Sequence, residues 1–134
     1  MHLWAILALS FSLADAAPPD PRLHTVKKIF VAGNNEAAEK IRSEVRKDTD
    51  KGKVCFALVT RSGDADATLD VADDSVKEPG LVSGRHDRVT ASVTLNSGDL
   101  IWSYTQSFSD APFMSGVKTA AGLVYGKLKK DACK

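Results

Sequence analysis

A short polar run in the second half of the chain holds residue types that often carry acid–base chemistry. Arg85, His86 and Asp87 are consecutive in a glycine-containing stretch that spans residues 75–88. An imidazole beside a carboxylate can act as a general base or help to bind an anion. The chain has no G-x-S-x-G nucleophile motif that would complete a catalytic pair. We interpret the run as a solvated loop, with a speculative loop site at these three residues as the alternative.

Several aspartates lie between residues 64 and 74, which invites a comparison with calcium-binding loops. The EF-hand pattern requires glycine at position six and glutamate at position twelve. Counted from Asp64, these positions are occupied by Leu69 and Ser75. Strand alternation would also send Asp70 and Asp73 to opposite faces of a sheet. We therefore predict a capped turn and a solvated strand end here, and we expect no metal ion or other cofactor.

Cys55 and Cys133 are the only two cysteines of the chain. In an exported protein they would meet an oxidising compartment, where disulfides form and persist. A bond between them would close a long loop and stabilise the fold by about 4.5 kcal/mol at most in the chain-entropy account. The alternative is a small buried Cys55 and a free thiol at Cys133. We predict the disulfide, because a lone exposed thiol is a liability in a secreted protein.

The first residues of the chain have the features of an export signal. Leu3–Leu13 is an apolar run about as long as the hydrophobic region of a signal peptide, and Ala14-Asp15-Ala16 resembles an A-x-A cleavage site. The run is shorter than the roughly 20 residues of a membrane span. A buried N-terminal helix is the alternative, but the three prolines that follow would break it. We expect cleavage between Ala16 and Ala17 and a periplasmic or secreted protein without a membrane span.

The remaining chain predicts a Pro-rich, extended tether over residues 17–26 and a single α/β domain over residues 27–134. Hydrophobic periodicity alternates between the strand and the helix repeat in the order β-α-β-β-β-β-α. Strands are expected at residues 27–32, 53–60, 67–73, 88–96 and from 100 onward, and helices at 34–52 and 115–130. This order is typical of a two-layer sandwich, in which a five-stranded mixed sheet carries both helices on one face.

The last two strands should form a hairpin around a Ser97-Gly98 turn. With that turn, the apolar side chains of one face pair as Leu95 with Leu100, Val93 with Trp102 and Ala91 with Tyr104. A slip of one residue would turn the second strand over and expose Trp102. The pattern therefore predicts that Trp102 is buried against Val93.

Two features of the C-terminal third could belong either to the core or to an interface. Gly122 and Gly126 in the last helix are expected to allow close packing, with a shallow groove for a partner as the alternative. Phe108, Phe113 and Met114 form either a hydrophobic staple before that helix or an exposed apolar patch.

The succession of motifs NEAAEKIRSEV, CFALVT, DADATLDV and the VTASVTL/LIWS hairpin resembles small exported bacterial proteins of unknown function over about residues 27–130. The strand Ala65–Val71 follows an A-D-x-x-L-x-V pattern. In this it is similar to the N-terminal α/β domain of the Tol-system propeller protein and to cell-envelope lipoprotein domains, such as those of the curli secretion channel. The chain lacks the lipoproteins' anchoring cysteine near the signal and the Tol protein's propeller. The resemblance implies a place in the cell envelope and a role in binding a partner.

The composition narrows the functional classes. The formal net charge of +1 gives no electrostatic reason to expect nucleic-acid binding, which usually requires a concentrated basic face. Our first hypothesis is an exported, non-catalytic cell-envelope or secreted module that binds another envelope protein or itself. The alternative is a small secreted enzyme or ligand-binding protein that uses the 75–88 loop.

Overall fold

The computed structural model describes residues 19–74, 76–77, 85–110 and 116–134. Its elements follow the order expected from the sequence, with the two-residue strand β4 in addition. In chain order they are the 3-10 helix η2 (Pro21–Thr25), β1 (Lys28–Ala32), α1 (Glu36–Lys51), β2 (Ala57–Val59), the 3-10 turn η3 (Ser62–Asp64), β3 (Ala67–Asp73), β4 (Val76–Lys77), β5 (Arg85–Leu95), β6 (Leu100–Asp110) and α2 (Val117–Ala132).

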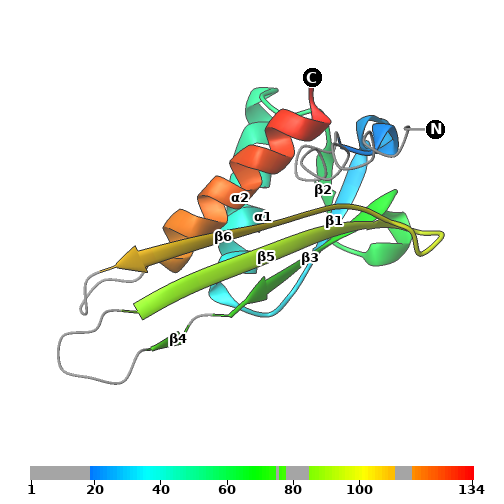
Figure 1. Ribbon diagram of the computed structural model, residues 1–134. Coiled ribbons are helices and arrows are strands. Elements are labelled where there is room, and N and C mark those ends of the chain that lie inside the picture. Colours follow the sequence, from blue (N-terminus) through cyan, green and yellow to red (C-terminus); the bar gives the residue numbers. More distant parts are fainter. Residues whose placement is uncertain (1–18, 75, 78–84, 111–115) are drawn as a thin grey trace, which may run out of the picture.

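The strands form one mixed sheet. β2, β1, β3 and β5 are neighbours in this order, while β6 and the short β4 both pair with β5. β1 runs parallel to β2 and β3, and β5 runs antiparallel to β3 and β6. Figure 1 shows α1 and α2 side by side over one face of this sheet. The predicted two-layer sandwich, with five main strands and both helices on one face, is confirmed.

Helix α1 forms where the local signals predict it. The Asn35 side chain accepts a hydrogen bond from the backbone N–H of Ala38 at 2.8 Å, which satisfies one donor of the first helical turn. The helix ends at Gly52, whose φ of 68° lies in the left-handed region that favours glycine. Ile41 and Val45 share one side of the helix with Ala38 and are fully buried. The amphipathic pattern therefore turns this side toward the sheet.

The hairpin keeps the predicted register over most of its length but not next to the turn. Val93 lies opposite Trp102, as expected, and the exposed fraction of Trp102 is 7%. A β-bulge between Val93 and Thr94 then places Thr94 opposite Leu100. The predicted pair of Leu95 with Leu100 is therefore wrong. The extra residue, Ile101, is buried in the core and leaves Leu100 61% exposed.

The segment expected to be an extended tether is instead folded onto the domain from Pro21 onward. Residues 21–25 form η2, and the Asp20 side chain caps it through the backbone N–H of Arg22. Leu23 and Val26, spaced three residues apart, are buried in the core. This burial of apolar surface explains why the segment does not remain extended.

The second strand is shorter than the predicted 53–60 and covers only Ala57–Val59. Phe56, just before it, is buried, and its carbonyl oxygen accepts a hydrogen bond from the Thr49 hydroxyl of α1 at 3.3 Å. The preceding residue, Cys55, is bonded to Cys133. These contacts turn the chain away from the sheet before β2 begins.

Some predicted features lie outside the described residues. They are the cleavage site at Ala16 and Ala17, the apolar residues Phe113 and Met114, and Ser115, the first residue of the expected last helix. The signal peptide over residues 1–16 therefore remains a prediction. Helix α2 itself begins at Val117, with Gly116 in the N-cap position, and extends to Ala132.

Candidate interaction surface

The three residues of the speculative site belong to a strand and not to a loop. Arg85, His86 and Asp87 are the first residues of β5, and their backbone pairs with the end of β6. Arg85 and His86 also pair with Lys77 and Val76 of β4. The side chains of Arg85 and His86 lie outside the part that the structure describes. Sequence periodicity did not predict this extension of β5, because the run is polar throughout.

The carboxylate of Asp87 is fully buried. Its Oδ2 accepts a hydrogen bond from the backbone N–H of Gly116 at 2.6 Å, at the start of α2. A negative charge at a helix N-terminus is stabilised by the unsatisfied N–H groups and by the helix dipole. Asp87 therefore anchors the start of α2 on β5. A carboxylate that suggested acid–base chemistry in the sequence thus has a structural role.

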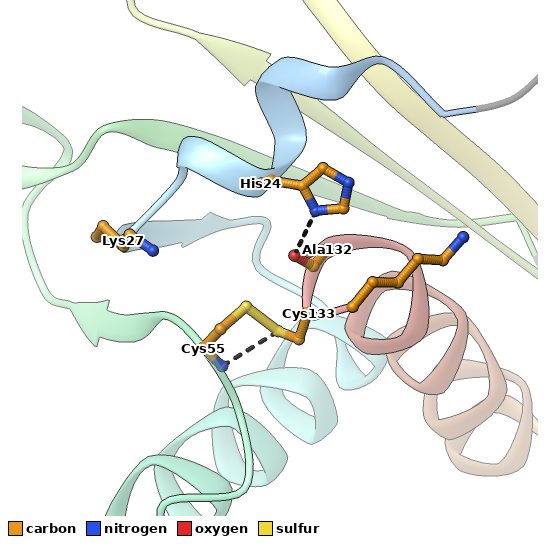
Figure 2. A pocket seen from close by; sticks show the side chains of 6 residues that line it. His24, Lys27, Cys55, Ala132 and Cys133 are labelled. Carbon is orange, nitrogen blue, oxygen red and sulfur yellow. Dashed lines mark hydrogen bonds between the residues drawn. A yellow bond between two sulfur atoms is a disulfide. The ribbon is translucent and has the colours of Figure 1, made fainter.

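The structure joins Cys55 and Cys133 in a disulfide, with a Cα–Cα distance of 5.5 Å (Figure 2). The backbone N–H of Cys55 also donates a hydrogen bond to Sγ of Cys133 at 3.1 Å. Cys55 lies two residues before β2, and Cys133 directly follows α2. The bond therefore fastens the end of α2 to the loop that enters the sheet, as the sequence predicts.

A shallow hollow of about 320 Å³ lies beside this disulfide. Figure 2 shows the His24 ring over the end of α2, where its Nδ1 is 3.0 Å from the carbonyl oxygen of Ala132. Because a carbonyl only accepts, Nδ1 must carry the proton. Lys27 and Lys134 make the rim basic, but the carbonyl end of a helix disfavours anions. Since both thiols are oxidised, the hollow offers no cysteine nucleophile, and its contacts hold η2 against α2.

A polar and aromatic group fixes α2 over β6. The indole Nε1 of Trp102 donates to Oδ2 of Asp131 at 3.0 Å, and the exposed fraction of Asp131 is 5%. Lys127 pairs with the other carboxylate oxygen at 3.3 Å and lies 5.9 Å from the ring centroid of Tyr104. Sequence reasoning missed Asp131, although its spacing of four residues from Lys127 was a signal for this ion pair.

The other side of α2 is fastened to α1 by a second polar group. The Tyr125 hydroxyl and the Lys129 ammonium donate to the same Oδ2 of Asp48, at 2.8 Å and 2.9 Å. The bond from Lys129, followed by that from Tyr125, lowers the pKa of Asp48. Burial, followed by the contact with Asp48, raises the pKa of Tyr125. The group therefore holds a carboxylate and a neutral phenol between the helices.

The aspartates near β3 have structural roles. Asp66 accepts the backbone N–H groups of Lys27 and Lys28 at 2.8 Å and 2.9 Å, which lowers the pKa of its carboxyl. Asp64 forms an ion pair with Arg61. Within the described ranges, no three His, Cys, Asp or Glu residues are grouped as metal ligands.

The outward side of β6 lies at an edge of the sheet. In the part that the structure describes, β6 pairs with β5 alone, and its run from Leu100 to Ser109 contains no charged residue or proline. On the open face of the sheet, Ser103, Thr105 and Ser107 are exposed. The Thr105 hydroxyl also lies 2.9 Å from that of Thr90 on β5.

Helix α2 contributes to the same side of the molecule. Leu123 is 48% exposed, and it precedes Lys127, which contacts Tyr104 of β6, by one helical turn. Leu100 and Leu123 are the large hydrophobic residues found exposed in the described ranges. We define the β6 edge as the outward side of strand β6 together with Leu123 and Lys127.

The two glycines of α2 are not closely packed. A Cβ at Gly122 would meet only the Cε of Lys40, at 4.0 Å, and one at Gly126 would meet no atom within 4 Å among the described residues. The expectation that these glycines allow close packing inside this chain is therefore wrong. Each lowers helix propensity by about 1 kcal/mol relative to alanine, so their alternative role at a partner site remains a prediction.

No helix in the described ranges combines the length and the hydrophobicity that a membrane span needs.

Comparison with known proteins identifies the fold only. No protein-family model and no curated protein matches the chain. Two structures of the PelC dodecamer from Paraburkholderia phytofirmans are similar, one with a TM-score of 0.55 at 19% identity and one with 0.53 at 16%. The alignments cover 81% of this chain and 89% and 88% of those chains. Lipoprotein GNA1162 from Neisseria meningitidis has a TM-score of 0.49 at 11% identity, with coverages of 81% and 99%.

The likeness to PelC shows a shared α/β sandwich. The solved structures similar to this chain also include bacterial lipoproteins at low identity. The resemblance to the Tol-system domain remains a prediction.

Proposed function

We propose that the protein is an exported, non-catalytic module that acts in the cell envelope or outside the cell by binding another protein at the β6 edge. The observation that carries this proposal is the strand itself. β6 is eleven residues long, and its run from Leu100 to Ser109, which carries no charge, presents backbone N–H and C=O groups on its outer side. Proteins that keep a strand edge free of partners usually shorten it or place lysine or proline on it. An edge without these protections is suited to strand addition.

Two further observations support the proposal. The disulfide between Cys55 and Cys133 is of a kind that persists in oxidising compartments and is rare in the cytosol. The fold is shared with PelC, a protein that assembles as a dodecamer, so the same scaffold can support protein–protein contacts. Asp87, the one residue of the speculative loop site whose side chain is described, is engaged with the start of α2.

Site-specific photo-crosslinking in the producing cells tests the proposal. A photoreactive residue replaces the exposed Ser103 of β6 in one variant and the exposed Asp70 of β3 in the other. Asp70 provides the matched control, because β3 lies inside the sheet, away from the β6 edge. We expect a protein adduct at position 103 and none at position 70. Equal crosslinking at both positions, or no adduct at position 103, would overturn the proposal.

A further inference from the structure

We propose that the partner at the β6 edge is the β6 edge of a second copy of this chain, paired antiparallel about a two-fold axis at Thr105. This inference rests on the proposed function, because it names the partner of the same surface. A two-fold axis gives both copies the same contacts, and antiparallel pairing of one strand with itself is the arrangement that such an axis produces.

The residues of β6 are compatible with this pairing. Thr105 is the midpoint of Leu100–Asp110, so an axis there places residues 102–108 of the two copies opposite one another, beyond the bulge at Ile101. Thr105 then faces its own copy, Tyr104 faces Gln106, and Ser103 faces Ser107. The hydroxyl pairs on the open face would repeat the contacts between Thr90 and Thr105, and between Ser92 and Ser103, inside the chain. Positions 100–109 contain no charged residue. The pairing therefore brings no like charges together over this range.

The position of α2 supplies the second argument. This helix is anchored on both β5 and β6, through Asp87 at its start and through Trp102 near its end, so it crosses from one strand to the other and its middle lies above the space between them. Pairing β6 with its copy would place the two α2 helices two strand spacings apart, which is about 9.6 Å. Packed helices lie about 8–10 Å apart. The strand pairing therefore brings the two helices to packing distance.

Helix packing at this distance would cover Leu123. The side of α2 toward α1 is occupied, since Tyr125 and Lys129 contact Asp48 there. The side toward the β6 edge carries Leu123, at 48% exposure, and Lys127, whose charge is paired with Asp131. An added peptide strand would pair with the backbone of β6 but leave Leu123 in water. A second copy provides a strand that pairs with β6 and, in the helix layer, a copy of α2 that covers Leu123. We therefore infer self-pairing.

The size of the interface agrees with that of a stable dimer. Eleven residues span about 37 Å at about 3.4 Å per residue. The contact would extend through a sheet layer and a helix layer, roughly 20 Å in depth, because these layers pack about 10 Å apart. The buried surface is then on the order of 700 Å² per copy, close to the ~800 Å² of a standard stable interface. The opposite edge strand, β2, has only three residues, too few for such an interface.

A charge-swap experiment on the mature chain, residues 17–134, with the disulfide intact tests the axis. Sedimentation equilibrium should show a dimer for the wild-type chain. Thr105→Asp and Thr105→Lys should each weaken the dimer about tenfold, because two like charges would meet across the axis. Mixing the two variants should restore a dimer that contains one copy of each. The matched control is Thr90→Asp mixed with Thr90→Lys: Thr90 already faces Thr105 of its own chain, so the mixture should show no preference for mixed dimers.

The outcomes separate this inference from the proposed function. A wild-type chain that stays monomeric up to millimolar concentration overturns the self-pairing, as does a dimer that is insensitive to both charges at position 105. If, in either case, the crosslink at position 103 still joins a different protein, the proposed function stands and only the identity of the partner is wrong. A Leu123→Ser variant should fold with an unchanged melting temperature as a monomer and dimerise more weakly. Unchanged dimerisation of this variant would exclude the contribution of α2.

Discussion

The two edge strands of the sheet, β2 and β6, differ in length and in their surroundings. β2 is three residues long and enters the sheet from a loop that a disulfide fastens to the end of α2. β6 is eleven residues long, carries no charge from Leu100 to Ser109, and is followed by no further strand in the described ranges. Short edge strands resist unwanted pairing, whereas long uncharged ones invite it. The comparison indicates that the fold keeps one edge strand short, next to a disulfide, and leaves the other long enough to bind a partner.

Removing the Trp102 indole near the start of β6 should have the largest effect on stability. Trp102 is buried and donates to Asp131, so Trp102→Ala leaves a cavity and removes a hydrogen bond from a buried carboxylate. We expect the free energy of unfolding to fall by about 3–5 kcal/mol, as measured by chemical denaturation.

Trp102→Phe is the matched control for this prediction. It retains a six-membered aromatic ring but removes the Nε1 donor and the rest of the indole, so the loss should be smaller, about 1–3 kcal/mol. An unchanged melting temperature for Trp102→Ala would show that the core face of the hairpin is assigned wrongly.

Removing the disulfide near β2 should have the second-largest effect on stability. The double variant Cys55→Ser and Cys133→Ser frees a loop with a sequence separation of 78. The expected loss of stability is about 2–4 kcal/mol, with an upper value near 4.5 from the chain-entropy account. Denaturant unfolding of this variant measures the effect. Two free thiols in the denatured, unreduced wild-type protein would contradict the assignment.

The polar group between the helices should contribute less and should depend on pH. The folded-state pKa of Asp48 is lowered, so its contribution is present above the unfolded pKa of about 3.9 and is lost as pH falls through the folded value. Asp48→Asn should lower the free energy of unfolding by about 1 kcal/mol at neutral pH. Asp48 is only 16% exposed, which strengthens the ion pair, but its partner Lys129 is 36% exposed, and water screens the interaction.

The pH dependence of this variant provides the control. Below about pH 3.9 the wild-type and Asp48→Asn proteins should approach the same stability in thermal melts. A difference that is as large at pH 2.5 as at pH 7 would show that the carboxylate charge has no part in the effect.

The features that the sequence predicted well depend on local chemistry. The predicted bounds of α1, where Asn35 caps the start and Gly52 ends the helix, and those of the strand Ala67–Asp73 depend on residues close to the backbone that they control. The disulfide was predictable because the chain has only two cysteines. The pairing of Val93 with Trp102 followed from alternation and a recognisable turn.

The features that the sequence did not predict depend on distant contacts. The bulge that buries Ile101 and exposes Leu100 is a property of the paired hairpin. Asp87 resembles a catalytic residue until the start of α2, 29 residues away, is placed against it. Leu23, predicted to lie in an extended tether, instead packs into the core that the other elements form. The β6 edge itself is defined by the strand order, which periodicity alone does not give.

Hydrogen–deuterium exchange at several protein concentrations tests the difference between the two edges most directly. If β6 is the binding edge and pairs with its own copy, amides in the segment Leu100–Asp110 should exchange about tenfold more slowly at high concentration than under dilution. Amides of Ala57–Val59 in β2 should exchange at the same rate at both concentrations. Slowing confined to β2, or concentration-independent exchange in both strands, would contradict the account.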